Sequence, residues 1–207
     1  KQDKVIRRLL RNAVRLRHLT NSMLEVDMAA LGIVNNSECL AIDILRSALM
    51  EVFDLIDPTV SDALENEQDL EKIRSVLKAH DFFLEADAGQ LARSINTDET
   101  KFSLIITNLL SNAFKYKTKS VFLKLLVDDE TVTVSVRDDG PGIPDSYHQQ
   151  IFDQYFQCEK VEDFPVRGHG LGLAGAQALA HALGGTLSLC RGIKGAEFVI
   201  SIKHDRN

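Results

Sequence analysis

Cysteine is scarce in this sequence, and its three cysteines are not placed for a disulfide framework or a zinc site. Cys39, Cys158 and Cys190 lie far apart, form no Cys-x-x-Cys pair and have no histidine nearby at ligand spacing. A small, odd number of thiols is typical of reduced cysteines in a cytosolic protein. We therefore expect a cytoplasmic location.

Long apolar runs are absent as well. No stretch approaches the roughly 18–20 residues that a helix needs to span a bilayer, and no signal peptide is visible. The chain begins with Lys1 rather than with methionine, which indicates an excised fragment. Any membrane segment or sensory domain of the parent protein would then lie outside this sequence.

An excess of positive charge is also missing. The formal net charge is −6, so binding to nucleic acid through overall charge is excluded and we expect no nucleic-acid partner. Basic residues nevertheless gather near the start of the chain, at Lys1, Lys4, Arg7, Arg8, Arg11, Arg15 and Arg17. They favour a solvated helix face, and a basic arm for nucleic acid or lipid is the alternative.

The sequence does contain enough apolar material for one well-packed domain and an appendage, because 44% of its 207 residues are hydrophobic. Residues 5–31 are predicted to form one long helix, and Gly32 is placed to end it. Its apolar residues recur at steps of three and four: Ile6, Leu9, Leu10, Ala13, Leu16, Thr20, Met23 and Val26. Such a narrow seam packs against another helix, within the chain or in a partner. We therefore divide the chain into an appendage, 1–32, and a domain, 33–207.

The first part of the domain is predicted to be mainly helical. Ala41–Asp57 and Ser61–Lys78 have helical patterns, and Pro58 separates them. Phe82–Ala86 fits a short strand. A further helix is predicted to begin at a cap formed by Thr97 or Asp98 and to end near Tyr116.

The second part of the domain contains two predicted β-hairpins with a helix between them. The successive segments are strands at Val121–Val127 and Thr131–Arg137, a helix at Leu171–Leu183, and strands at Thr186–Cys190 and Glu197–Lys203. Helices on one side of a mainly antiparallel sheet indicate an α+β fold, a two-layer α/β sandwich.

Three blocks contain the residues suited to chemistry. In the first, Asn108, Asn112 and Lys115 share one face of the predicted helix, since they lie at i, i+4 and i+7. The two carboxamide oxygens suit a hydrated Mg²⁺ that substrate phosphates also hold, and the lysine offers a point charge to those phosphates. Taken alone, the block also fits an ordinary amphipathic helix with polar outer residues.

The second block, Asp138-Asp139-Gly140-Pro141-Gly142, follows a predicted strand directly. A carboxylate at Asp138 would accept a hydrogen bond from an exocyclic amine. Gly140 and Gly142 have no side chains and let the backbone approach a flat base closely. In isolation, the same residues also fit a tight turn.

The third block, Gly168-His-Gly-Leu-Gly-Leu-Ala174, opens a predicted helix, whose first N–H groups can bind an anion. Its Gly170-x-Gly172-x-x-Gly175 spacing matches the dinucleotide fingerprint, but the context excludes a Rossmann fold. No strand precedes it, because residues 161–167 are polar and include a proline. Only about thirty residues follow, too few for a doubly wound sheet.

Together the three blocks resemble the GHKL superfamily, whose nucleotide site is the Bergerat fold. A fourth motif of histidine kinases, the F box, fits Ile151–Phe156. The motifs occur in the family's order: N box 108–115, first glycine box 138–142, F box 151–156, second glycine box 168–172. The chain thus resembles the catalytic ATP-binding domain of histidine protein kinases, well over 98–203 and only loosely over 33–97.

This resemblance implies the cofactors ATP and Mg²⁺ and a role for each motif residue. Asn108, Asn112 and Lys115 are the expected catalytic residues, with Asn108 and Asn112 as the Mg²⁺ ligands. Asp138 is expected to select adenine, and Tyr116 and Ile143 to line the base pocket. Further nucleotide contacts are expected at Gly140, Gly142, Phe156, Gly168, His169, Gly170, Leu171, Gly172 and Leu173. Residues 157–168 are expected to form a short lid over the nucleotide.

The first N-box position indicates a subfamily. GHKL ATPases have a glutamate there that activates water, whereas an amide such as Asn108 cannot act as a general base. By resemblance, the γ-phosphate is then transferred to a protein histidine. The helix at 5–31 resembles the second helix of the kinase dimerisation hairpin. None of the six histidines has the acceptor context of that hairpin.

The expected partners are a dimerisation hairpin of the same protein that bears the acceptor histidine, a response regulator receiver domain, and a second copy in a full-length homodimer. A non-catalytic regulatory module that binds nucleotide or a partner kinase is one alternative, although the intact motifs weigh against it. A serine kinase of the anti-sigma type is another, and the first helix and Asn108 weigh against it.

Overall fold

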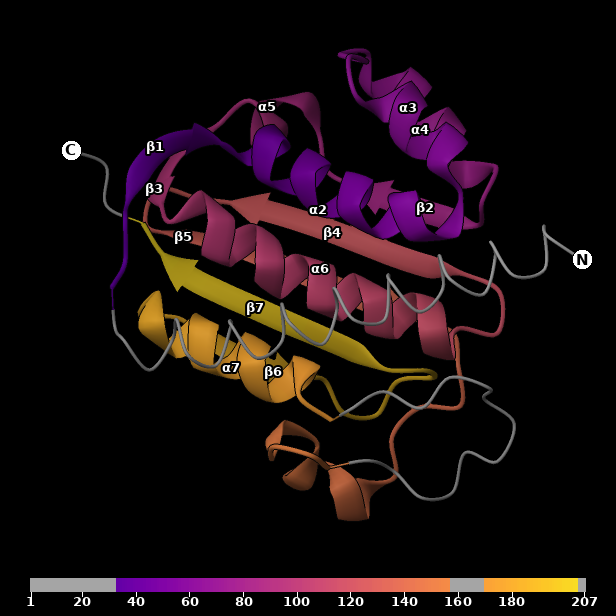
Figure 1. The fold of residues 1–207 in the computed structure, drawn as a ribbon, viewed down its shortest axis with the longest axis vertical. Coiled ribbons are helices and arrows are strands. Elements are labelled where there is room, and N and C mark those ends of the chain that lie inside the picture. Colours follow the sequence, from indigo (N-terminus) through magenta and orange to yellow (C-terminus); the bar gives the residue numbers. More distant parts are fainter. Residues whose placement is uncertain (1–32, 157–169, 205–207) are drawn as a thin grey trace, which may run out of the picture.

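The computed structural model describes residues 33–156 and 170–204, which form a five-stranded sheet covered by helices (Figure 1). In spatial order the strands are β2 (Phe82–Glu85), β4 (Val121–Val127), β5 (Thr131–Asp138), β7 (Glu197–Lys203) and β6 (Thr186–Leu189). The β2–β4 pair is parallel and the other three pairs are antiparallel. Both predicted hairpin pairs and the short strand near residue 82 are therefore confirmed.

Three helices lie along one face of this sheet: α2 (Ala41–Ile56), α6 (Glu99–Tyr116) and α7 (Gly172–Ala182). The strands alternate accordingly, since in β5 every second residue from Val132 to Asp138 is buried. The predicted two-layer α/β sandwich is confirmed. Among the described helices, none is long and apolar enough to cross a membrane.

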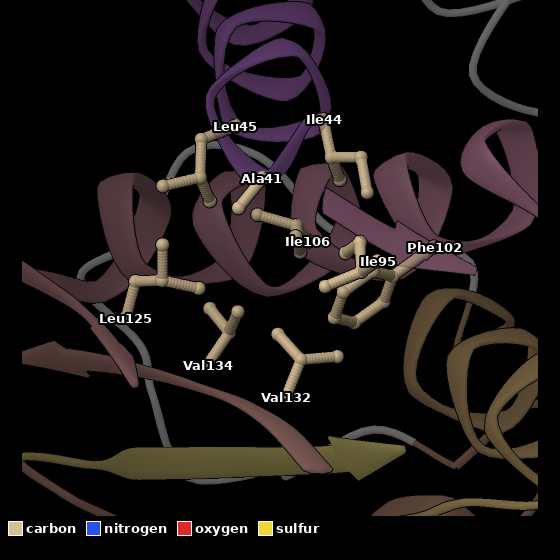
Figure 2. Close-up of a pocket in the computed structure, with 9 residues that line it drawn as sticks. All are labelled: Ala41, Ile44, Leu45, Ile95, Phe102, Ile106, Leu125, Val132 and Val134. Atoms are coloured by element: carbon tan, nitrogen blue, oxygen red, sulfur yellow. The ribbon is translucent and has the colours of Figure 1, made fainter. Parts of the chain in front are cut away.

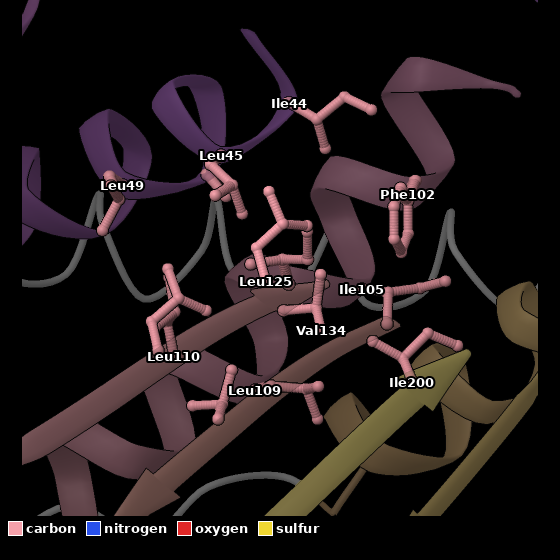
Figure 3. Close-up of a cluster of buried hydrophobic side chains, with 14 of the residues drawn as sticks. Ile44, Leu45, Leu49, Phe102, Ile105, Leu109, Leu110, Leu125, Val134 and Ile200 are labelled. Carbon is pink, nitrogen blue, oxygen red and sulfur yellow. The ribbon is translucent and has the colours of Figure 1, made fainter. Parts of the chain in front are cut away.

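The core lies between the helices and the sheet. Figure 3 shows Leu45 and Leu49 of α2 and Leu109 of α6 in one cluster with Leu125 and Val134 of the strands, and all five are buried. A pocket under α2 is lined only by apolar side chains of this core: Ala41, Ile44, Leu45, Ile95, Phe102, Ile106, Leu125, Val132 and Val134 (Figure 2). Among the described residues, no polar side chain lines it that could orient a ligand, so we assign it to core packing.

A small second sheet was not predicted. β1 (Ser37–Leu40) and β3 (Ser94–Thr97) pair antiparallel, and a single helical turn, α5 (Ala88–Leu91), precedes β3. Each strand has only four residues, too few for a period to be recognised in the sequence. The pair places the start of the described chain beside the residue that caps α6.

The helix predicted at 61–78 is wrong, because two shorter helices replace it: α3 (Pro58–Leu64) and α4 (Leu70–Lys78). Asp69 caps α4 by accepting hydrogen bonds from the amides of Glu71 and Lys72. Arg46 of α2 donates to the carbonyls of Glu65 and Glu67 at 3.3 and 2.8 Å. These carbonyls therefore bond a side chain instead of continuing the helix.

Helix α6, which bears the N-box residues, begins at a buried charged cap. The Asp98 carboxylate accepts a hydrogen bond from the Lys101 amide and lies 2.6 Å from the Lys101 ammonium. It also accepts the amide of Asn35 at 3.0 Å. Both charged side chains are almost fully buried. Asp98, one of the two predicted caps, is thus the N-cap, and it ties residues before β1 to α6.

Several predictions fall on residues outside those that the structure describes. They are the helix at 5–31, the lid at 157–168, and the nucleotide contacts of Gly168 and His169. They remain predictions.

Candidate nucleotide-binding site

Asp138 is the last residue of β5, and it is buried like every second residue of this strand from Val132 onward. Among the described residues, its Oδ1 accepts the amide of Gly140 at 2.8 Å and that of Ala196 at 3.4 Å. Burial raises the pKa of this carboxyl above the usual aspartate value, although the two amides oppose the rise. Asp138 is thus a desolvated carboxylate whose hydrogen bonds from the protein converge on Oδ1.

Glycines allow three backbone segments to converge on Asp138. A Cβ at Gly140 would overlap the carbonyl oxygen of Tyr116, at the end of α6. A Cβ at Gly195, whose φ is +86°, would overlap the carbonyl of Asp138. Gly142 (φ +78°) packs in turn on Gly195, since a Cβ at Gly142 would lie 3.0 Å from the Gly195 carbonyl oxygen. The first glycine box therefore joins α6 to the loop between β6 and β7.

The predicted polar face of α6 is present. Asn108, Asn112 and Lys115 are partly exposed, while Leu109 and Leu110 on the same helix are fully buried. The Asn108 side-chain amide donates to the carbonyl of Leu104 at 3.1 Å. The Lys115 ammonium lies 4.7 Å from the centre of the Tyr116 ring. The three predicted residues thus form one polar surface beside the core.

The second glycine box meets this surface at Gly172, the first residue of α7. A Cβ there would lie 3.0 Å from Oδ1 of Asn108. Within the described residues, α7 has no side-chain cap, since its N-cap residue is Leu171. The prediction that the N box and the second glycine box belong to one site agrees with this contact.

The F box packs against the second glycine box. The amide of Tyr155 donates to the carbonyl of Gly170 at 2.8 Å, and a Cβ on Gly170 would lie 2.6 Å from the Tyr155 carbonyl carbon. Phe156 contacts the ring of Tyr147 at 5.4 Å between centroids. Ile143 is partly buried, and its carbonyl lies 2.8 Å from Nε2 of His148. The segment after β5 is thereby folded against the core.

Three residues at this site have contacts that the sequence did not predict. Ala196 makes two hydrogen bonds with Asp138: its carbonyl accepts the Asp138 amide at 2.9 Å, and its amide donates to Oδ1 of Asp138 at 3.4 Å. Gly195 makes that approach possible. Asp139, next to Asp138, binds three backbone amides of the connection from α6 to β4. Gly195 between two predicted strands indicates a turn, but no sequence signal shows which segment the turn contacts.

The donor set fits a cation that is shared with phosphate groups. Within the described ranges, no three His, Cys, Asp or Glu side chains gather as a metal site. Asn108 and Asn112 instead offer neutral carboxamide oxygens one helical turn apart. Magnesium prefers oxygen ligands and keeps several waters, so it needs few protein groups when phosphates are present.

Comparison with known proteins agrees with this geometry. Residues 97–206, more than half of the chain, match the family described as histidine kinase-, DNA gyrase B-, and HSP90-like ATPases. The chain belongs to this family. Membership of an ATPase family implies that the domain binds ATP.

The chain is similar to parts of sensor kinases. It is 31% identical over 97 residues to the sensor histidine kinase WalK of Bacillus subtilis (strain 168), an alignment that covers 45% of this chain and 16% of WalK. The chain therefore corresponds to a small part of that protein.

Two solved structures share the fold. The mycobacterial sensor histidine kinase MprB matches 84% of this chain and all of the solved chain, with a TM-score of 0.58 and 18% identity. Full-length ShkA in complex with AMPPNP matches the whole of this chain and 39% of its own, with a TM-score of 0.67 and 22% identity. The fold is that of histidine kinase catalytic domains.

Proposed function

We propose that this chain is the ATP·Mg²⁺-binding catalytic core of a two-component sensor histidine kinase. Its nucleotide site is assembled from four motifs, and its first N-box residue, Asn108, is an amide next to Gly172 of the second glycine box. That pairing is the observation that supports the proposal best. It places a group that cannot accept a proton where an ATPase of this fold needs a base.

Adenine recognition is assigned to Asp138. Its Oδ1 already accepts two amides, so Oδ2 is the oxygen that we assign to the exocyclic amine. A buried carboxylate makes a strong charge-assisted hydrogen bond because water does not compete for it. Gly140 and Gly142 keep the backbone beside it free of side chains, and Tyr116 and Ile143 are assigned to the walls of the base pocket.

Phosphate and metal binding are assigned to the other end of the site. Asn108 and Asn112 would hold Mg²⁺, which neutralises charge on the phosphates when it is bound. Lys115 adds a positive charge from the next turn of α6. The first amides of α7, at Gly172 and Leu173, would bind phosphate oxygens, aided by the helix dipole. Gly168, His169, Gly170, Leu171 and Phe156 complete the proposed set.

The residues of this site position the γ-phosphate rather than activate water. Phosphoryl transfer needs alignment and charge stabilisation more than covalent chemistry from the protein. With an amide at position 108, the acceptor must bring its own nucleophile. We assign that role to a histidine on the dimerisation hairpin, whose second helix we place at residues 1–32. A homodimer, a response regulator receiver domain and a cytoplasmic location belong to the same proposal.

The metal assignment is tested by titration calorimetry with AMPPNP, with and without Mg²⁺. The wild-type chain should bind more tightly with Mg²⁺. Asn112→Ala should lose most of that increment and keep its affinity in the absence of metal, because the substitution removes only a ligand oxygen. Asn96→Ala, in β3 away from the site, is the matched control and should behave as wild type. An unchanged Mg²⁺ increment in Asn112→Ala would contradict the assignment, and no binding by wild type would favour a regulatory module that binds a partner kinase.

A further inference from the structure

The Asp139 side chain connects the two segments that bear residues assigned to the adenine pocket, the end of α6 with Tyr116 and the end of β5 with Asp138. Its Oδ1 accepts three successive backbone amides, those of Thr118, Lys119 and Ser120, at 2.9, 2.9 and 3.0 Å. Its own amide donates to the Ser120 carbonyl at 3.3 Å. One side chain thus holds the whole connection between α6 and β4 against the end of β5.

That connection determines where the end of α6 lies. Helix α6 ends at Tyr116, and the amide of Lys117 still bonds the Ala113 carbonyl at 2.8 Å. The chain then reaches Val121, which pairs directly with Asp138 in the β4–β5 register. Only three residues separate Lys117 from Val121, and Asp139 binds the amides of all three. The positions of Tyr116 and Asp138 are therefore coupled through Asp139.

The tolerance at this junction is small. The Tyr116 carbonyl already packs so tightly on Gly140 that a Cβ there would overlap it. A shift of the α6 end would either break this contact or displace Gly140. Because Gly140 donates to Oδ1 of Asp138, such a shift would also disturb the carboxylate that is assigned to adenine.

We propose that Asp139 is a positioning residue of the nucleotide site, which holds the end of the N-box helix in register with the adenine-binding Asp138. It acts by accepting three amides and does not itself contact the nucleotide. This inference rests on the proposed function for its effect on binding. The structural part of the inference, the coupling of the two segments, does not depend on the proposed function.

The charge of Asp139 is maintained by the same contacts. Burial raises the pKa of this carboxyl, but the amides of Lys119, Ser120 and Thr118 lower it more, so the pKa lies below the usual aspartate value. Geometry is nevertheless the essential contribution, because an asparagine oxygen can accept the same amides. The conservative variant Asp139→Asn therefore separates positioning from charge.

Asp128 provides a matched control at the opposite end of the same hairpin. Its Oδ1 accepts the amides of Glu130 and Thr131 at 2.9 and 2.7 Å, in the turn between β4 and β5. In Figure 1 this turn lies at the other end of β4 from the α6 connection. Asp128→Ala removes a comparable set of bonds without touching the site.

The test measures AMPPNP affinity in folded Asp139→Ala, Asp139→Asn and Asp128→Ala proteins, each compared with wild type. Asp139→Ala should bind about tenfold more weakly, since loosening a preorganised pocket reduces affinity. Asp139→Asn should stay within about twofold of wild type, because the acceptor oxygen remains. Asp128→Ala should bind as wild type even where its stability falls. Wild-type affinity in Asp139→Ala, or an equal loss in Asp139→Asn, would overturn the proposal.

Amide hydrogen exchange separates this inference from the proposed function. Asp139→Ala should speed exchange at residues 118–120 and also lower the protection of the Gly140 amide, which donates to Asp138, while Asp139→Asn restores both. If wild type does not bind AMPPNP, the proposed function fails, and the exchange result alone decides whether the two segments are coupled. Unchanged protection of the Gly140 amide in Asp139→Ala would overturn the coupling.

Discussion

The Asp138→Asn substitution tests the adenine assignment because the structure dictates how the asparagine must sit. The amides of Gly140 and Ala196 both donate to Oδ1. The asparagine oxygen must take that position, since an NH₂ group there would face two donors. The NH₂ group is then left at the position of Oδ2, where it would meet the exocyclic amine of adenine. A hydrogen-bond acceptor for the ligand is thereby replaced by a donor.

The expected effect on binding follows from the replacement of this acceptor by a donor. Loss of one charge-assisted hydrogen bond costs about 1.5–3 kcal/mol, which corresponds to roughly ten- to a hundredfold in Kd. Titration calorimetry with AMPPNP measures it directly. An unchanged Kd in a folded Asp138→Asn protein would refute the adenine assignment.

The stability of the same variant provides its control. Burial raises the pKa of the Asp138 carboxyl above its usual value, so folding costs the ionised form more free energy than the protonated form. The stabilising contribution of this carboxyl is therefore present at low pH and is lost as the pH rises through the raised pKa. Asp138→Asn should be at least as stable as wild type at pH 7. The difference between their free energies of unfolding should become smaller as the pH is lowered toward the usual aspartate pKa of about 4. Urea unfolding at both pH values checks this and shows that weaker binding is not unfolding.

Two further predictions concern residues that hold the elements of the site in place. Lys101→Met leaves the buried Asp98 carboxylate without its cation and should lower the free energy of unfolding by about 3–5 kcal/mol, as measured by urea denaturation. Burial raises the pKa of Asp98, but the bonds from Lys101 and Asn35 lower it more, so this stabilisation should be lost in wild type as the pH falls through the lowered pKa. Gly140→Ala forces a Cβ against the Tyr116 carbonyl and should abolish AMPPNP binding in calorimetry. Gly192→Ala strains a backbone with φ +77° but brings a Cβ within 4 Å of nothing, so it should lose some stability and retain binding.

The parts of the fold that could be predicted are those with a strong local period. Helix α6 shows its buried leucines and its polar Asn and Lys face in the sequence, and β5 alternates valine with polar residues. The strands β1 and β3 have only four residues each, too few to show such a period in the sequence. The break at Glu65–Asp69 depends on Arg46, nineteen residues away from Glu65 along the chain, which no local pattern reveals.

The site was predictable in its side chains and not in its backbone contacts. Asp138, Asn108 and Gly172 stand in motifs whose residue types indicate their chemistry. The bonds between Asp138 and Ala196, and between Asp139 and residues 118–120, join segments that are far apart in sequence. Backbone amides have the same chemistry at every non-proline position, so a sequence does not show which of them a carboxylate will bind.

The central claim is tested most directly by following labelled ATP. The chain is incubated with γ-labelled ATP and Mg²⁺, alone and with a separately produced hairpin of the parent protein that bears the acceptor histidine. Alone, it should bind nucleotide, hydrolyse it very slowly and acquire almost no acid-labile phosphate, because Asn108 cannot activate water. With the hairpin, it should transfer phosphate to the histidine, at a rate limited by the bimolecular encounter. Rapid hydrolysis without the hairpin, or strong labelling of the chain itself, would contradict the account.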